Sequence, residues 1–311
     1  MKSILIVGSG ALATVYATKL SYNPDCQLQM YCEWHAGIQA IQQKGITCFH
    51  NDTELKTKPL KATTDPDQIQ PVDLILVLVK SWQTGNLVSQ IQDKLKSNGV
   101  CLTLQNGLGN LQILQKNFSD ERVIAGTTMV GAELLKPAIV RITFLGGMQI
   151  SEHPANQWII PLFQQSGFEI SSNSDLESVL WGKLIINAVV NPLTVIFQSR
   201  NGVLIESEES LALIDAMIDE IMLLINAKGI TLPYPDAHSQ VRYAINKTAQ
   251  NLSSMAQDWK RNVPTEIENI TGAILQEAKK YNLTMPVNQT IYQLVTAGLA
   301  AKMSTIIDIQ E

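Results

Sequence analysis

The stretch Ile4–Ala13, which reads ILIVGSGALA, decides the fold of this chain. Its apolar first half is typical of a buried strand, and it passes through the pattern G-x-G-x-x-A into Thr14–Leu20, where apolar residues have helical spacing. Such a turn is the fingerprint of a dinucleotide-binding unit: Gly8 permits the tight turn, and Gly10 lets a pyrophosphate approach the backbone at the helix N-terminus. The residues expected to contact the cofactor are Gly8, Ser9, Gly10, Ala11, Leu12 and Ala13.

A second apolar stretch, Gln27–Cys32, is followed directly by Glu33. An acid at the end of the second strand can accept hydrogen bonds from both hydroxyls of the adenosine ribose, and it would repel a 2′-phosphate. Glu33 therefore favours NAD(H) over NADP(H). A cation such as Lys61 or Arg122 could still supply a phosphate clamp, so the sequence leaves both cofactors open.

Length and composition are those of an ordinary globular protein. The chain has 311 residues, 45% of them hydrophobic, which is enough for two domains. A formal charge of −5 without a Lys/Arg run gives no reason to expect a nucleic-acid partner. By sequence we see neither an apolar stretch of about 18 residues nor a signal-peptide core, so we expect a cytoplasmic protein without a membrane partner. A homodimer is compatible with this composition.

The cysteines and histidines give no sign of a metal site or a disulfide framework. The four cysteines lack C-x-x-C spacing, and the four histidines are scattered along the chain. We therefore expect no metal.

Two later apolar runs predict further strands of a parallel sheet. Val72–Val79 ends at Lys80, and Gly99–Gln105 ends at Asn106. In open α/β sheets, ligands bind outside the carboxyl ends of the strands. Lys80 and Asn106 are therefore either idle loop residues or, as we expect, residues at the place where cofactor and substrate meet.

Strands and helices alternate as far as about Gln165–Asp175, and the pattern beyond is helical. We predict an α/β fold with a Rossmann-like doubly wound sheet in residues 1–172 and an all-helical domain in residues 173–311, with the active site in the cleft between them. The helices expected in the second domain are Asp175–Leu193, Ser207–Lys228, Ala237–Trp259, Glu266–Tyr281 and Val287–Ile307.

The first of these helices carries an unusual polar stripe. Lys183, Asn187 and Asn191 stand four residues apart in the otherwise almost wholly apolar run Leu180–Thr194, and on a helix they would share one face. Burying such groups without partners costs roughly 1–3 kcal/mol each. The stripe is either satisfied by neighbouring carbonyls or forms a ligand site, and the cofactor motif upstream favours the ligand site.

Six separated motifs resemble those of the ketopantoate reductase (2-dehydropantoate 2-reductase) family, in the right order and over essentially the whole chain. They are Val79–Thr84, Leu104–Gly109, Trp181–Thr194, Ser199–Gly202, Asn251–Met255 and Thr265–Ile267. The resemblance implies an enzyme of pantothenate, hence coenzyme A, biosynthesis that reduces 2-dehydropantoate to (R)-pantoate with a reduced nicotinamide.

The resemblance also implies roles for individual residues. Lys183 would be the general acid, and Glu266 would hydrogen-bond the substrate and help set that lysine. Lys80 and Asn106 would act where the nicotinamide meets the substrate. The residues implied to hold the substrate or support its pocket are Asn187, Asn191, Asn201, Asn251 and Ser254.

Ketone reduction requires such residues on chemical grounds as well. Hydride addition leaves negative charge on the carbonyl oxygen, which a preorganised cation and amide donors stabilise best. A lysine desolvated among apolar neighbours has its pKa lowered, and a nearby carboxylate raises it again. Asn251 and Ser254 are three residues apart, so one face of the predicted helix could present both.

Alternatives remain at two points. The family usually uses NADP(H), and its better-known members have a basic residue where this chain has Glu33. The same contacts to the carboxylate and ketone would also suit a reductase of another 2-oxo acid. A non-catalytic regulator that binds a nicotinamide could also have kept this fold. The presence of both Lys183 and Glu266 argues for catalysis.

Overall fold

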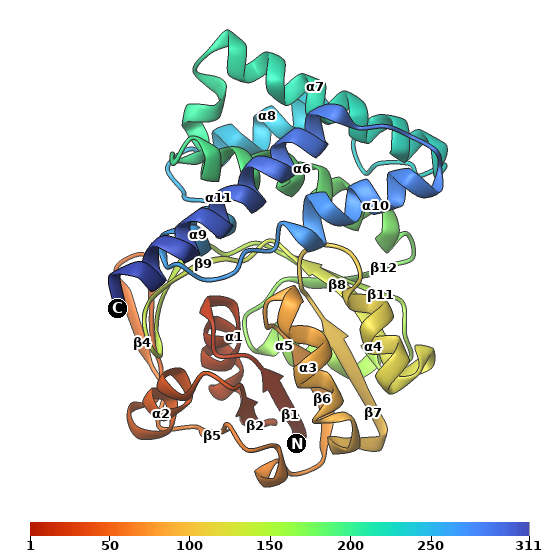
Figure 1. The fold of residues 1–311 in the computed structure, drawn as a ribbon. Helices are drawn as coiled ribbons and strands as arrows, with labels where there is room; N and C mark the ends of the chain where they lie inside the picture. Colours follow the sequence, from red (N-terminus) through yellow and green to blue (C-terminus); the bar gives the residue numbers. More distant parts are fainter. Residues whose placement is uncertain (311) are drawn as a thin grey trace. The chain divides into compact units, whose positions relative to one another are not determined.

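The computed structural model describes residues 1–310, with side chains as far as Lys302. These residues form two compact units: unit 1 comprises Met1–Gln105 and Gly109–Leu176, and unit 2 comprises Asn106–Leu108 and the chain from Glu177 onward. Unit 1 is a mixed α/β structure and unit 2 is helical (Figure 1). The predicted fold class, a Rossmann-like sheet followed by an all-helical part, is confirmed.

The main sheet of unit 1 has the strand order β12-β11-β8-β7-β6-β1-β2-β5 in the described chain. All neighbouring strands are parallel except β8 and β11. The chain runs outward from β1 to β2 and β5 and then returns to β6 on the other side of β1, so the topological switch point lies between β1 and β6. The bounds are β1 Lys2–Val7, β2 Cys26–Tyr31, β5 Lys61–Thr63, β6 Val72–Val77, β7 Leu95–Thr103, β8 Val123–Thr128, β11 Met148–Ser151 and β12 Ile170–Asn173.

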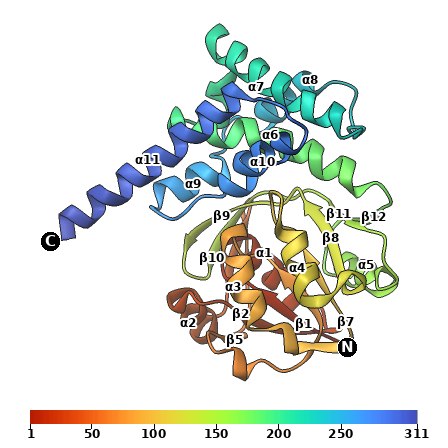
Figure 2. The ribbon, with the colours of Figure 1, turned by 45° about the vertical axis from the view of Figure 1, so that its right-hand side comes forward.

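Helices cover both faces of this sheet (Figures 1 and 2). Side chains of α1, α2 and α5 share one apolar core with the sheet, and side chains of α3 and α4 share another. Two buried faces explain why the central strands β1 and β6 are continuously apolar. The helices are α1 Ala11–Ser21, α2 His35–Lys44, α3 Thr84–Ser89, α4 Asn110–Phe118 and α5 Asn156–Gln165, with short 3-10 turns at Pro66–Gln68, Ser81–Gln83, Gln92–Lys94 and Asp120–Arg122.

A smaller four-stranded sheet within unit 1, of order β4-β3-β10-β9 in the described chain, was not foreseen from the sequence. It packs a small apolar cluster that includes Cys48, Val140 and Ile142 against Val15 of α1. Its strands are β3 Thr47–His50, β4 Thr53–Lys56, β9 Gly131–Lys136 and β10 Ile139–Phe144.

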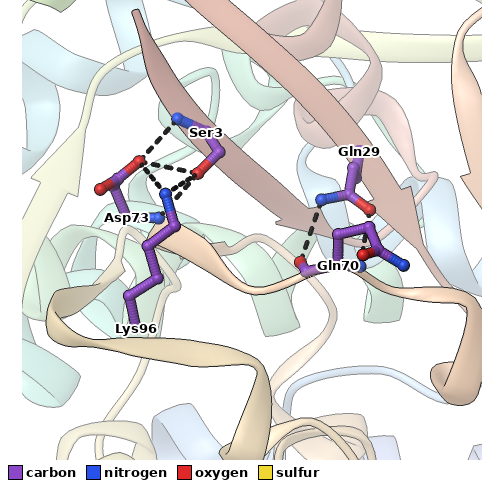
Figure 3. Close-up of polar contacts among 5 residues, drawn as sticks. All are labelled: Ser3, Gln29, Gln70, Asp73 and Lys96. Atoms are coloured by element: carbon purple, nitrogen blue, oxygen red, sulfur yellow. Dashed lines mark hydrogen bonds and ion pairs between the residues drawn. The ribbon is translucent and has the colours of Figure 1, made fainter.

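A polar network ties β1, β6 and β7 together where these strands begin, at the edge opposite the glycine turn (Figure 3). The Asp73 carboxylate accepts from the backbone N–H (2.9 Å) and hydroxyl (2.7 Å) of Ser3 and from the ammonium of Lys96 (2.9 Å). Burial raises the pKa of Asp73, but the hydrogen bonds from Ser3 and Lys96 outweigh it and hold that pKa at about 2. Nearby, Gln29 pairs with the backbone of Gln70 through both ends of its amide.

Unit 2 is built around α6, the helix that carries the polar stripe. By length and composition α6 could cross a membrane, which contradicts the expectation that no stretch of the chain is long and apolar enough. Its most apolar window is 67% buried inside the protein, as in the core helix of a globular domain. The bounds in unit 2 are α6 Leu176–Ile196, α7 Glu208–Ala227, α8 Ala237–Lys247, α9 Ser254–Lys260, α10 Ala273–Lys280 and α11 Pro286–Gln310, with a 3-10 turn η5 at Asn201–Ile205 and a π-helical turn η6 at Glu268–Gly272.

The single helix predicted over Ala237–Trp259 is wrong. The structure has α8 and α9, separated by a turn that contains Asn251. The chain breaks here because the Ser253 hydroxyl accepts from the N–H of Ala256 and so caps a new helix. Asn251 and Ser254 therefore do not share a helix face: Asn251 lies in the turn, and Ser254 is the first residue of α9.

Candidate active site

The turn between β1 and α1 has the features that a pyrophosphate requires. Gly8 has φ +131°, and a Cβ there would lie 3.1 Å from the carbonyl oxygen of Leu78 on the neighbouring chain segment, so both conformation and space demand glycine. A Cβ at Gly10 would meet nothing within 4 Å, which leaves that face of the turn open. The N-terminus of α1 has no side-chain cap and no acidic residue in its first turn, so its N–H groups and dipole favour an anion.

Ser9, inside the same turn, has a buried hydroxyl with no hydrogen-bond partner among the described residues. A buried hydroxyl normally has a partner, since leaving it unsatisfied costs about 1–3 kcal/mol. This hydroxyl therefore fits a turn made to receive a ligand, and the residues present fit a bound dinucleotide.

Glu33 lies two residues beyond β2 and is held by amides from the other side of β1. Its Oε1 atom accepts from Asn86 Nδ2 (2.9 Å) and from Gln90 Nε2 (3.1 Å). Gln90 is itself fixed, because its Oε1 atom accepts from the hydroxyl of Tyr31 (2.7 Å). Neither Asn86 nor Gln90 was singled out from the sequence, since no spacing relates residues of α3 to the end of β2.

The two cations considered as phosphate clamps do not lie beside Glu33. The Arg122 guanidinium donates to the carbonyl oxygens of Gly99 (3.1 Å) and Lys96, where β7 begins, at the opposite edge of the sheet. Lys61 pairs with Gln29 in the register of β2 and β5, roughly 13 Å along the strand before Glu33.

Lys80 lies in a turn after β6 that is tied to the end of β7. The Gln105 amide donates to the Val79 carbonyl oxygen (2.7 Å) and to the Thr84 hydroxyl (2.8 Å). The Thr84 hydroxyl donates in turn to Oδ1 of Asn110 at the start of α4 (3.1 Å). These three hydrogen bonds, at least partly buried, hold the turns after β6 and β7 in one arrangement.

Asn106 directly follows Gln105 but belongs to unit 2. The N–H of Leu108 donates to the carbonyl oxygen of Asn269 (2.8 Å), and Asn269 Nδ2 approaches the carbonyl oxygen of Leu108 (3.4 Å). The Leu108 side chain packs against the apolar core of unit 2. The structure thus groups Asn106 with the helices, not with the sheet that it follows in sequence.

Lys183 and Glu266 are brought together within unit 2. Lys183 is only partly exposed on α6, and Glu266 is 5% exposed just before the π-helical turn η6. Burial lowers the pKa of Lys183 to about 8, while the nearby Glu266 carboxylate raises it. An ammonium with this pKa is protonated at neutral pH and still releases its proton more readily than an ordinary lysine.

The amides of the stripe follow Lys183 along α6. Asn187 is half-buried. Asn191 is 4% exposed, and its Nδ2 atom has no hydrogen-bond partner within residues 1–302. A buried amide donor without a protein partner fits a ligand-binding face better than a satisfied core.

Asn201 supports the turn that carries Asn251. The backbone N–H of Asn201 donates to the carbonyl oxygen of Asn251 (3.0 Å), and Asn201 Nδ2 donates to the Thr248 hydroxyl (2.8 Å). Beyond the turn, the Ser253 hydroxyl lies 2.6 Å from the hydroxyl of Thr194 on α6. The start of α9, where Ser254 lies, is therefore fastened to the last turns of α6.

Among the described residues, no group of three or more His, Cys, Asp or Glu side chains could hold a metal ion. The four cysteines are free thiols.

One unit has a dinucleotide-binding turn, and the other has a lysine–glutamate pair and, on the helix of that lysine, the amide donor of Asn191 without a partner among the described residues. Together these features define a nicotinamide-dependent oxidoreductase. Comparison with known families makes this specific. Residues 4–155 match the family model described as ketopantoate reductase PanE/ApbA, and residues 175–299 match the model of its C-terminal part. The chain belongs to the ketopantoate reductase family.

Individual relatives are similar to this chain over nearly its whole length and over nearly all of their own. A 2-dehydropantoate 2-reductase of Vibrio cholerae is 30% identical over 94% of this chain and 96% of its own. The crystal structure of a PanE/ApbA family ketopantoate reductase from Ralstonia eutropha has a TM-score of 0.90 at 25% identity and covers 97% of this chain and 99% of its own. D-mandelate dehydrogenase with NADH and anilino(oxo)acetate has a TM-score of 0.91 at 23% identity, covering 96% and 99%, and shares the fold.

Proposed function

We propose that this protein reduces 2-dehydropantoate to (R)-pantoate with a reduced nicotinamide, as a step of pantothenate biosynthesis. The observation that carries the proposal is the Lys183–Glu266 pair in a chain that is 30% identical to a 2-dehydropantoate 2-reductase. The pair offers a protonated acid of lowered pKa, which is what the ketone oxygen needs.

The chemical step assigns the proton to Lys183. When bound, the reduced nicotinamide supplies the hydride. As negative charge develops on the ketone oxygen, the Lys183 ammonium stabilises it and transfers a proton from Nζ, which completes the hydroxyl of the product. The Glu266 carboxylate keeps this lysine protonated before the reaction, because it raises a pKa that burial alone would lower further.

The amides of unit 2 serve to hold the substrate. Asn187 and Asn191 extend from Lys183 along α6, and Asn251 and Ser254 come from the turn and helix fastened beside it. Each carboxamide offers two donors and an acceptor without net charge, which suits a small acid rich in oxygen. Asn201 acts through the backbone and side-chain bonds that fix the turn of Asn251.

The cofactor is assigned to Gly8–Ala13, with Lys80 and Asn106 at its nicotinamide end. NADH is the preferred form. Asn86 and Gln90 both donate to Oε1 of Glu33, which holds the carboxylate in place while Oε2 remains for the ribose hydroxyls. A 2′-phosphate beside this carboxylate would meet a repulsion of about 1 kcal/mol in water and more at lower dielectric.

Oxidation of NADH or NADPH by the purified protein, with 2-dehydropantoate as oxidant, tests the reaction. We expect turnover that depends on 2-dehydropantoate, and a loss of kcat of about 10²–10⁴-fold in Lys183→Ala. Lys247, exposed on α8 of the same unit, supplies the matched control, since Lys247→Ala should retain full activity. Wild-type kcat in Lys183→Ala would remove that lysine from the mechanism.

A reductase of another 2-oxo acid is the second candidate. Its support is the shared fold of D-mandelate dehydrogenase, whose structure holds NADH and a 2-oxo acid derivative. Turnover of aryl-substituted or unbranched 2-oxo acids, with none of 2-dehydropantoate, would favour it. A non-catalytic nicotinamide-binding regulator would bind the cofactor and turn over none of them.

A further inference from the structure

Three residues of the chain leave unit 1 and return to it within one turn. Gln105 is anchored in unit 1 by its bonds to Val79 and Thr84, and Gly109 is the N-cap residue of α4 in the same unit. Between them, Asn106–Leu108 is grouped with unit 2. The segment therefore takes its position from the helices although both of its neighbours are fixed to the sheet.

The segment Asn106–Leu108 is held tightly to unit 2, because its backbone lies very close to the backbone of Asn269. The Leu108 N–H reaches the Asn269 carbonyl oxygen at 2.8 Å, which brings Gly107 against the same carbonyl. A Cβ at Gly107 would lie 2.5 Å from that oxygen and 2.9 Å from its carbon. Gly107 also has φ +81°, a conformation that L side chains rarely adopt. Asn269 is held by η6, the π-helical turn that begins two residues after Glu266.

We propose that Gly107 and Asn269 are positioning residues that place Asn106 in register with Lys183 and Glu266. This rests on the proposed function, in which Asn106 acts where the nicotinamide meets the substrate. The Leu108–Asn269 pairing and the packing of Leu108 on the unit 2 core fix the backbone next to Asn106. Asn106 thereby belongs to the same compact unit as Lys183, the proposed general acid. A change at Gly107 should displace Asn106 relative to both Lys183 and Glu266.

The test compares two glycines of one turn. Gly109 has φ +91°, similar to Gly107, but a Cβ there meets nothing within 4 Å. Gly107→Ala and Gly109→Ala therefore share the backbone strain, and only Gly107→Ala forces Asn269 away. We expect Gly107→Ala to lower kcat/KM for 2-dehydropantoate about 100-fold, since a misplacement near 1 Å costs that much. Gly109→Ala should stay within about threefold.

A double-mutant cycle separates positioning from general damage. If Gly107 acts through Asn106, Gly107→Ala should cost no more than about threefold in an Asn106→Ala background. Asn269→Ala, which removes only the Nδ2 contact to Leu108, should cost about fivefold alone and nothing in that background. Full additivity of these changes would overturn the proposal.

Backbone hydrogen exchange measures the pairing of Leu108 with Asn269 independently of catalytic turnover. Peptides covering residues 104–112 should show the Leu108 N–H protected in the wild type and in Gly109→Ala, and exposed in Gly107→Ala. Equal exchange in all three would overturn the proposal. A wild type that binds NADH but never reduces 2-dehydropantoate would instead refute the proposed function. In that case the exchange data alone would still show whether Gly107 is needed for the pairing of Leu108 with Asn269.

Discussion

Replacing Lys183 by methionine should stabilise the protein at neutral pH while it abolishes reduction. The folded protein holds the pKa of this lysine at about 8, against about 10.4 for an unfolded chain. Because one pKa unit is worth about 1.4 kcal/mol, carrying the charged lysine costs the folded state roughly 3 kcal/mol. Lys183→Met has nearly the same length and no charge, so it removes that cost.

The sign of the pH dependence follows from proton linkage. Below pH 8 the lysine is charged in both the folded and the unfolded state, and the whole cost is present. Between pH 8 and about 10.4 the unfolded chain binds more protons, so the wild type gains stability as pH rises. The free energy of unfolding of Lys183→Met should therefore exceed that of the wild type by up to about 3 kcal/mol at pH 7, and the excess should vanish near pH 10.5.

Urea denaturation of both proteins at pH 7 and pH 10.5 measures this difference. Effects of alkaline pH on other groups cancel, because they occur in both proteins. Lys247→Met, at an exposed position of α8, should show no such pH-dependent difference from the wild type. If the gap between Lys183→Met and the wild type is the same at both pH values, Lys183 is not desolvated and the assignment of its lowered pKa is wrong.

Three further outcomes are expected. The kcat/KM of the wild type should fall as pH rises through about 8, when Lys183 loses its proton, and Glu266→Gln should move this fall to lower pH by about one unit; an unmoved profile would separate Glu266 from the lysine. Titration of NADH and NADPH fluorescence should show tighter binding of NADH by about tenfold, and Glu33→Arg should reverse the order; a wild type that prefers NADPH would show that Glu33 does not meet the ribose. The folded pKa of Asp73, about 2, lies below its unfolded value, so its contribution of about 2 kcal/mol is present above pH 4 and lost as pH falls toward 2; the stability gap between the wild type and Asp73→Asn should close over that range, and a constant gap would contradict the network of Figure 3.

Local sequence determined the elements that depend only on neighbouring residues. The turn at Gly8 requires a positive φ and a close approach that only glycine permits, and the stripe from Lys183 to Asn191 follows from the period of a single helix. Both could be predicted, as could the class of each part of the chain. The boundary predicted after residue 172 stays a prediction.

Capping decided a feature that periodicity could not. The apolar spacing continues from Ala237 to Trp259, but the Ser253 cap starts a new helix and leaves Asn251 in a turn. A serine can lie inside a helix or begin one, and the choice here depends on its contact with Thr194 of a different helix.

Tertiary structure alone decided which distant residues act together. No spacing in the sequence relates Asn86 and Gln90 to Glu33, or Asn269 to the turn at Gly107. These pairs depend on the order of strands in the sheet and on the packing of helices, and neither is encoded in residues that are close in sequence. The sequence determined the chemistry available at each position. The fold determined that Asn106, which follows a strand of the sheet, belongs to the same compact unit as Lys183 and Glu266.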